Sequence, residues 1–592
     1  MGARAIEGIA FPRPYKFTGL GEYFWRNQYG AQAGLLPLPE NAPEFILNLK
    51  KSIVPEEGTG GPTYTRATTA YVTDFEGLLK QVPSGCARFT GARMVRNWLT
   101  TTSENFSNAA WTKDATTTVT AGQTDPIGGT TAYKIENVTA ADGVYNLCTG
   151  FPTTAGNTFT ASIWIKGAVG GEVVNLGYLN TTATVTASTS WQRMSVTALT
   201  NDIYFRIRPQ GANSTIYVWR ALGEDVTGQT ITAPSEYVSV GVLSAPYHGA
   251  GADGVKYFDT ENGNTVASNV VTEAPGAAIP DATLKGYLAE GARQNRCLYS
   301  QDFSNAAWVA TSITKGSTVA APDGSTTAMT LTASGANGTL LQTLTAVSAA
   351  KAFSIWMKRR TGTGTIQMTM DNGVGWTTKT ITSSWARYTV TQTVANEVCG
   401  IRIVTSGDAI DVWGAQVETG TGESTYIPTT SGAVTRNADV LNYSATYSTL
   451  IDAAGSAYVE VSVNNASGSG VIDVEGDGGT GPIYWGTASA IITSMYDGTT
   501  AASPAAGSPS VSFGTPYKVA SSWGAGKMRI SQELYGIGAD ANFDGSWSPG
   551  SSAAGLWLGG GNGGANPHFG TIRNVRLWTF ALSREKLSAI TA

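Results

Sequence analysis

The chain has 592 residues, and 38 lysines and arginines against 43 aspartates and glutamates give it a net charge of −5. Apolar residues make up 42% of the chain and charged residues 14%, so the composition supports a buried core and excludes a globally disordered protein. Nucleic-acid binding is disfavoured because no lysine- and arginine-rich tract is present, and no apolar run reaches the about 18 residues that span a bilayer. The 71 glycines among many threonines and serines predict an all-β protein with short strands and frequent turns.

Residues 1–61 hold aromatic residues and prolines in no regular period, in runs such as FPRPYKF and LLPLPENAPEF. Such a segment is typical of an irregular arm that becomes ordered against another protein. The chain starts without the apolar core of a signal peptide, so we expect a protein made in the cytoplasm.

Two related connectors follow along the chain. Residues 62–96 predict a β-hairpin, because the acidic residue and glycine of Glu76-Gly77 favour a turn between two strand-like runs. This connector ends with Gly91-Ala92-Arg93 close to its last residue, and the same three residues recur as Gly291-Ala292-Arg293 directly after the second connector, residues 235–290.

An internal repeat occupies residues 97–234 and 291–432. Its landmarks keep their order through four tryptophans, which chance similarity does not do. Between them, runs such as TFTASIWIK and RYTVTQTV alternate apolar and polar residues and are separated by turn clusters, so each repeat is predicted to form one jelly-roll β-sandwich. The matching pairs include Phe106 and Phe303, Trp111 and Trp308, Trp164 and Trp356, Trp191 and Trp385, Arg208 and Arg402, and Trp219 and Trp413.

Residues 433–592 are again strand-like, in runs such as SAYVEVSVN and TIRNVRLWTFAL. They predict a third β-sandwich. The segment SREKLSAIT near the end predicts a short helix capped by Ser583.

Several of these motifs together resemble structural proteins of tailed bacteriophages. The pattern consists of the Gly-Ala-Arg connector, the motifs FSNAAW, SIW(I/M)K and SWxR, and a closing strand VWGAQVE followed by STYIPT. In such proteins, sandwiches similar to carbohydrate-binding modules are strung along tail fibres, head fibres or related appendages. The resemblance covers about Tyr64 to Tyr443, while Gly570 to Ile590 looks like the end of a concanavalin-like or laminin-G-like sandwich.

The resemblance implies a virion protein, made in the host cytoplasm and exposed on the particle surface, that attaches to host-surface polysaccharide. It implies that the N-terminal arm binds other virion proteins and that the chain self-associates, as a homotrimer. Two alternatives stay open: a structural protein that decorates the capsid or tail without binding sugar, and a glycan depolymerase.

Sugar binding needs exposed aromatic faces with polar neighbours. Tryptophans kept by both repeats are expected to serve packing, since the shared fold is what both copies have in common. The glycan-binding candidates are therefore aromatic residues in unique loops or in the last domain, namely Trp376, Trp485, Tyr496 and Trp547.

Few residues in the sequence are candidates for a catalytic role. His248 and His568 lie apart from any evident Ser or Cys nucleophile, so no catalytic residue is assigned. We expect no cofactor, with calcium as the one exception. Asp473, Glu475 and Asp477 alternate in VIDVEGDGG, so their carboxylates share one strand face and could bind calcium; the alternative is a solvated acidic face.

The four cysteines contain no CxxC pair, which disfavours a zinc site. Cys297 and Cys399 are expected as buried thiols, and a disulfide is open to them if their strands are neighbours.

Overall fold

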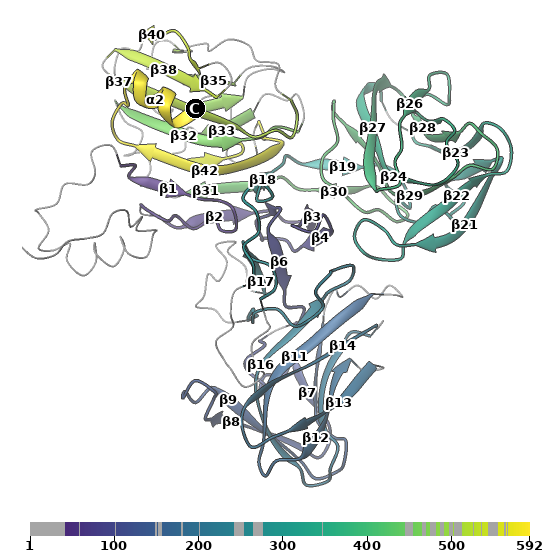
Figure 1. The fold of residues 1–592 in the computed structure, drawn as a ribbon, viewed down its shortest axis with the longest axis vertical. Helices are drawn as coiled ribbons and strands as arrows, with labels where there is room; N and C mark the ends of the chain where they lie inside the picture. Colours follow the sequence, from purple (N-terminus) through teal and green to yellow (C-terminus); the bar gives the residue numbers. More distant parts are fainter. Residues whose placement is uncertain are drawn as a thin grey trace, which may run out of the picture.

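The computed structural model describes residues 42–58, 60–100, 102–148, 151, 157–178, 181–199, 202–241, 254–263, 276–345, 347–443, 454–464, 469–473, 481–485, 491–496, 501–502, 512–524, 526–533, 536–542, 555–561, 564 and 566–592. Within these residues the fold is built almost wholly from antiparallel β-strands, which confirms the predicted all-β class. Three lobes meet at a common centre (Figure 1).

One lobe, here called the central sandwich, holds the C-terminus and consists of two packed sheets. One sheet runs β39 (Gly536–Ile537), β38 (Lys527–Gln532), β37 (Tyr517–Gly524), β32 (Gly455–Val461), β42 (Gly570–Trp578), β18 (Gly286–Ala289) and β5 (Phe89–Thr90), with β1 (Phe45–Leu47) also beside β42 and β40 (Ala541–Asn542) beside β38. The other runs β2 (Pro62–Thr65), β31 (Val440–Tyr443), β41 (Leu556–Leu558), β33 (Ser469–Asp473), β34 (Gly481–Trp485), β35 (Ile491–Tyr496) and β36 (Ala501–Ala502).

The domain boundaries drawn from the sequence differ from this lobe. The predicted arm contributes β1, the connector at 62–96 contributes β2 and β5, and the connector at 235–290 contributes β18. Strand β42 pairs with both β1 and β18, and β31 pairs with β2. Residues 433–592 alone would leave the backbone groups of β42 and β31 without these partners, and an unpaired buried backbone group is costly. Residues 1–41 of the predicted arm lie outside the described residues.

The two repeats form matching sandwiches that are inserted into the central sandwich. The sheet farther from the insertion point, here called the far sheet, runs β13 (Thr181–Ala187), β12 (Glu172–Tyr178), β15 (Tyr204–Pro209), β10 (Val144–Leu147) and β7 (Trp111–Lys113) in the first sandwich, and β26 (Thr377–Lys379), β25 (Ile366–Thr369), β28 (Val398–Ile403), β23 (Gly338–Thr343) and β20 (Val309–Thr311) in the second. The opposite sheet, the stem sheet, runs β14 (Gln192–Leu199), β11 (Thr158–Gly167), β16 (Thr215–Asp225), β9 (Ala132–Asn137) and β8 (Thr117–Gln123) in the first, and β27 (Ala386–Val394), β24 (Ala349–Thr361), β29 (Ala409–Thr419), β22 (Ala328–Ala333) and β21 (Ile313–Val319) in the second.

A two-stranded antiparallel stem carries each inserted sandwich. Strand β6 (Arg93–Arg96) pairs with β17 (Val255–Phe258) at the first, and β19 (Arg293–Asn295) pairs with β30 (Val434–Arg436) at the second. The repeated Gly-Ala-Arg motif therefore marks the start of each stem. The hairpin of β3 (Ala70–Thr73) and β4 (Leu79–Val82) lies between the first stem and the second sandwich (Figure 1).

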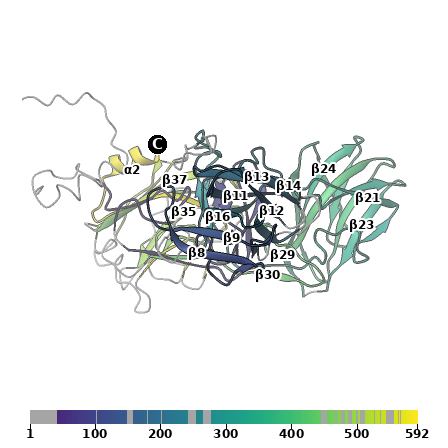
Figure 2. The same cartoon turned by 90° about the horizontal axis from the view of Figure 1, so that it is seen from below.

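The predicted C-terminal helix is present as α2 (Arg584–Thr591). Ser583 caps it by accepting a hydrogen bond from the backbone N–H of Lys586, and Leu587 buries its apolar side against the central sandwich. The first sandwich projects away from the other two lobes (Figure 1), so that in the view from below it lies in front of their junction (Figure 2). Among the described residues, no helix has the length and hydropathy needed to cross a membrane.

Candidate functional site

A row of polar side chains crosses the exposed face of the far sheet in the second sandwich. Gln367 of β25 lies opposite Arg402 of β28 on one side and Thr378 of β26 on the other. Nε of Arg402 donates to Oε1 of Gln367 at 2.8 Å, and Nε2 of Gln367 donates to Oγ1 of Thr378 at 3.2 Å. Since Ile401 and Ile403 on either side of Arg402 are buried, strand alternation places the row on the outer face.

Trp376 lies beside this row, in the loop that leads into β26. Its indole ring is half-buried, and the guanidinium carbon of Arg402 is 4.3 Å from the ring centre, a cation–π contact. Gly373 makes room for the ring, because a Cβ there would come within 2.8 Å of it. The predicted glycan candidate Trp376 thus stands next to a fixed set of hydrogen-bonding groups.

The first sandwich repeats the row with other residues of the same chemistry. Asn175 of β12 lies between Arg208 of β15 and Thr184 of β13. Arg208 here binds a carboxylate, with 2.9 Å between its NH2 nitrogen and Oδ2 of Asp114. An arginine, a carboxamide and a threonine therefore recur at matching register positions on both far sheets.

Aromatic rings accompany this second row as well. Tyr145 of β10 and Tyr204 of β15 meet edge to face with 5.6 Å between ring centres, and the guanidinium carbon of Arg206 is 5.3 Å from the ring centre of Tyr145. All three side chains are half-buried on the outer face. The alignment of the two repeats pairs Arg208 with Arg402, but it does not reveal the rows of polar side chains to which they belong. The alternation of both arginines with buried apolar neighbours was the signal that marks them as outward-facing.

Two of the shared tryptophan pairs, Trp164 with Trp356 and Trp219 with Trp413, lie on the stem sheets, where all but the half-buried Trp356 are buried as expected. Trp164 and Trp219 are 2% and 1% exposed, and Trp413 is 0% exposed. In the second sandwich, Trp356 and Trp413 contact Tyr426, and the β3–β4 hairpin packs Leu79 into the same cluster.

Of the other predicted glycan candidates, Trp485 and Tyr496 belong to the central sandwich and not to the second sandwich that holds Trp376. Trp485 ends β34 and pairs through its backbone with Ile491, whereas Tyr496 ends β35 and pairs with Ala501, so the two occupy opposite ends of one hairpin in the central sandwich. The side chains of Trp485 and Tyr496, and the whole of Trp547, lie outside what the structure describes.

The predicted calcium residues are described only in part. Asp473 ends β33 and is buried, whereas Glu475 and Asp477 lie outside the described residues. Within the described part of the chain, no three His, Cys, Asp or Glu side chains are arranged to hold a metal ion. Calcium binding by Asp473, Glu475 and Asp477 stays a prediction.

Cys297 and Cys399 are neighbours in the core of the second sandwich. Their sulfur atoms lie 4.0 Å apart as free thiols, and both side chains are fully buried. Burial raises the pKa of the Cys297 thiol well above its usual value, so it is not a reactive nucleophile at neutral pH.

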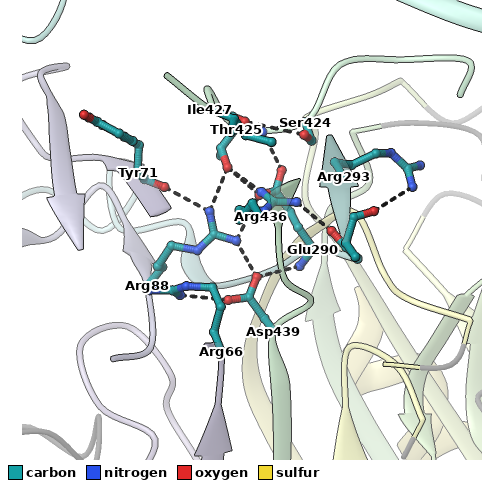
Figure 3. Close-up of polar contacts among 12 residues, drawn as sticks. Arg66, Tyr71, Arg88, Glu290, Arg293, Ser424, Thr425, Ile427, Arg436 and Asp439 are labelled. Atoms are coloured by element: carbon teal, nitrogen blue, oxygen red, sulfur yellow. Dashed lines mark hydrogen bonds and ion pairs between the residues drawn. The ribbon is translucent and has the colours of Figure 1, made fainter. Parts of the chain in front are cut away.

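The densest polar cluster is a buried ion network where the second stem meets the central sandwich and the β3–β4 hairpin (Figure 3). Asp439 accepts hydrogen bonds from Arg66 and Arg88, and Glu290 accepts from Arg88 and Arg436. These five side chains are at most 2% exposed.

The network is closed on all sides by structural partners. Arg88 also donates to the backbone carbonyl of Tyr71 at 2.9 Å, and the hydroxyl of Thr425 donates to Glu290 at 2.6 Å. Although burial alone would raise the pKa of Asp439, the nearby guanidinium groups hold it well below its usual range. Both carboxylates are paired with guanidinium groups, although the Nε atoms of Arg88 and Arg436 are buried without a hydrogen-bond partner. A network so enclosed fixes the stem and offers no place for a substrate.

Comparisons with known proteins add little to this geometry. No family model and no curated protein matches the chain. A tandem of two CBM22 domains from Paenibacillus barcinonensis Xyn10C aligns with 56% of this chain and 98% of its own at 9% identity and a TM-score of 0.19. Domain 4 of AbnA, a GH43 extracellular arabinanase of Geobacillus stearothermophilus solved with arabinotriose, aligns with 29% of this chain and 82% of its own at 13% identity and a TM-score of 0.18. Trypanosoma rangeli sialidase aligns with 90% of this chain and 99% of its own at 8% identity and a TM-score of 0.19. At such TM-scores these similarities carry no inference about what the chain does.

Proposed function

We propose that this protein is a non-catalytic glycan-binding protein that holds saccharides on the exposed far sheets of its two inserted sandwiches. The observation that carries the proposal is the row of arginine, carboxamide and threonine that recurs on both faces, with aromatic rings beside it. A repeated core residue serves the fold, but these side chains point away from the core, so packing does not account for their recurrence.

The chemistry of the rows suits a sugar. The apolar C–H face of a pyranose packs on an aromatic ring, while its hydroxyl groups exchange hydrogen bonds with guanidinium, amide and hydroxyl groups. The contact between Arg402 and Gln367 fixes both side chains before a ligand arrives, which lowers the entropy lost on binding. Two faces on one chain would convert weak single contacts into avidity.

The finer proposal concerns where this binding is used. The resemblance to tailed-bacteriophage proteins supports a fibre or appendage on the virion surface that attaches to host polysaccharide, with other virion proteins and further copies of the chain, in a trimer, as its partners. Electron cryo-microscopy of particles with and without the protein tests this. Loss of a projecting appendage together with loss of adsorption supports it, and an unchanged particle contradicts it.

A second candidate is a structural protein that decorates a capsid or tail and binds no sugar. The buried ion network favours it, because Arg88, Glu290 and Asp439 lock the second stem to the central sandwich and so give the molecule a fixed shape. Such a protein would keep neighbouring subunits in register without any ligand.

A glycan array probed with the full chain and with Trp376→Ala tests the proposed function. We expect the wild type to bind a subset of polysaccharides and Trp376→Ala to weaken binding about tenfold, as the loss of a central aromatic contact does. Phe513→Ala is the matched control, since this aromatic side chain is 55% exposed in the central sandwich, away from the row. Binding that Trp376→Ala leaves unchanged argues against the second far sheet, and the absence of any bound glycan favours the structural candidate.

A further inference from the structure

A cavity of about 210 Å³ lies where the first sandwich, the β3–β4 hairpin and the second sandwich meet. Tyr71 and Gln81 come from the hairpin, Arg96 from the first stem, Asp225 from the end of β16, and Asp323 from a loop of the second sandwich. It lies apart from both far sheets, since none of the residues in the polar rows lines it.

The walls of the cavity are held together by direct contacts. Gly228 and Gly324 bring the loops of the two sandwiches into touch, and a Cβ at either glycine would come within 2.7 Å of the other's backbone. The backbone N–H of Thr230 donates to Oε1 of Glu76 in the hairpin turn at 3.0 Å, and that of Leu79 donates to the carbonyl of Pro322 at 3.2 Å. The cavity is therefore a fixed feature of the junction and depends on both sandwiches being in place.

Its lining is polar and ordered. An NH1 nitrogen of Arg96 donates to Oε1 of Gln81 at 3.3 Å, and the guanidinium carbon lies 3.3 Å from the ring centre of Trp98, which holds Arg96 flat on the indole. Asp225 and Asp323 both line the cavity, and Oδ1 of each accepts from a backbone N–H, that of Thr227 and that of Ser325, at 3.0 Å. Burial raises the pKa of Asp323, and the charge of Asp225 adds to the rise. Tyr71 lines the same cavity, and burial together with the charges of Asp323 and Asp225 raises the pKa of its hydroxyl.

The charges of the lining balance. Three cations, Lys80, Arg93 and Arg96, stand against three acids, Glu224, Asp225 and Asp323. Arg93 is already paired with Glu236 at 2.5 Å, and Glu224 accepts from the backbone N–H of Ser235 at 2.9 Å. Glu236 lies outside the lining, so the site with its partners carries at most one excess negative charge; this, with its many donors and acceptors, favours a neutral ligand rich in hydroxyl groups over an anion. Among the described residues, no three His, Cys, Asp or Glu side chains are placed to hold a metal ion.

We propose that this junction cavity binds a single neutral sugar residue, with Asp225 and Asp323 accepting from its hydroxyl groups and Arg96 and Gln81 donating to it. The volume lies below the about 300 Å³ at which pockets for drug-sized ligands begin, which fits one sugar ring better than an oligosaccharide. The choice of sugar as the ligand class rests on the proposed function, whereas the presence of the cavity is independent of it. Sugar in this place would contact both sandwiches at once and would tie glycan binding to their relative position.

Saturation-transfer NMR of the full chain with D-glucose, D-galactose, N-acetyl-D-glucosamine and L-rhamnose tests the proposal. We expect at least one of them to bind, and the double variant D225N/D323N to weaken that binding about tenfold or more, since each change removes a charged acceptor without changing shape. Gly324→Val, which would wedge the two loops apart, should abolish the same signal. Melting curves identify any variant that fails to fold.

Trp376→Ala separates the two sites. Monosaccharide binding that survives Trp376→Ala but is lost in D225N/D323N supports the cavity. Binding lost in Trp376→Ala and retained in D225N/D323N overturns the cavity site while leaving the proposed function intact. The cavity site is also overturned if the wild type binds glycans on the array but none of the four monosaccharides. If the wild type binds these monosaccharides but no array glycan, the far-sheet site is rejected and the cavity site is kept.

Discussion

Asp439 shows how a few residues hold the second sandwich in place. Its two carboxylate oxygens accept from Arg66 and Arg88, and its neighbour Glu290 accepts from Arg88 and Arg436, all in the interior. The residues come from both sides of the second insertion, because Glu290 precedes β19 and Arg436 ends β30. Removing one partner from such a network leaves a buried charge without compensation.

We therefore expect Asp439→Asn to lower the free energy of unfolding by about 3 to 5 kcal/mol. The guanidinium groups lower the pKa of Asp439, so its contribution is complete above the unfolded carboxyl pKa of about 4 and is lost as the pH falls below it. Denaturant melts of wild type and variant at pH 7 and pH 3 would show a large difference at pH 7 and a smaller one at pH 3. Lys51→Ala, which breaks an exposed pair with Asp259, should change stability by less than about 1 kcal/mol; equal effects of both variants would contradict this account.

His568 should govern a different pH range. Its Nε2 lies 2.8 Å from the carbonyl oxygen of Ser462, and burial lowers its pKa to about 4. The unfolded chain, with a histidine pKa of about 6.5, takes up the proton first, so stability falls by up to about 3 kcal/mol as the pH drops from 6.5 to 4. His568→Gln should flatten the pH dependence of the melting temperature of the central sandwich in that range. A slope that the variant leaves unchanged would show that His568 is not its source.

At the scale of elements, one buried asparagine ties each stem to its sandwich. The side-chain nitrogen of Asn295 donates to the carbonyls of Ala415 and Ile427, and its oxygen accepts from the N–H groups of Cys297 and Val417. Asn97 makes the equivalent set of contacts in the first sandwich. A carboxamide is needed here because it supplies two donors and two acceptor positions at one point.

Asn295→Ala should destabilise the second sandwich by about 3 kcal/mol, because buried backbone groups lose their partners. Asn97→Ala should act alike on the first sandwich and leave the second unchanged. Gln294→Ala, at the adjacent exposed position of β19, serves as the control. Hydrogen exchange resolved by segment can assign each loss, and a loss spread evenly over both sandwiches would contradict the separate roles of the two stems.

The sequence could predict strands but not all of their partners. Alternation in runs such as TFTASIWIK marks β11 and β24, and repetition predicts that their sandwiches match. In contrast, Phe45 of β1 pairs with Leu577 of β42, and Pro62 of β2 pairs with Tyr443 of β31. The sequence of a short strand does not indicate which distant strand it will pair with. The arm and the connectors were therefore predicted as units separate from the central sandwich. For the same reason Trp376 could be proposed from its loop, whereas the row beside it needed the register of three strands.

As a whole molecule, the protein is a central sandwich with two insertions, and this predicts which fragments fold. Residues 291–437 contain the second sandwich, its own core and both strands of its stem, so they should fold alone. Residues 433–592 lack β1, β2, β5 and β18 and the core residues Phe45, Leu47 and Tyr287, so they should not. Dispersed amide NMR signals and a cooperative melt for the first fragment only are the expected results. A cooperatively folding second fragment would contradict the shared core.

Hydrogen–deuterium exchange of the full chain, with and without a saturating oligosaccharide from the array, will show whether glycans bind to the far sheets. We expect slower exchange in residues 366–379 around Trp376, together with residues 144–147 and 204–208 of the first sandwich, where Tyr145 and Arg208 lie. Protection confined to the central sandwich around Trp485 and Tyr496, under conditions where binding is saturated, would contradict the claim and move the site to that lobe.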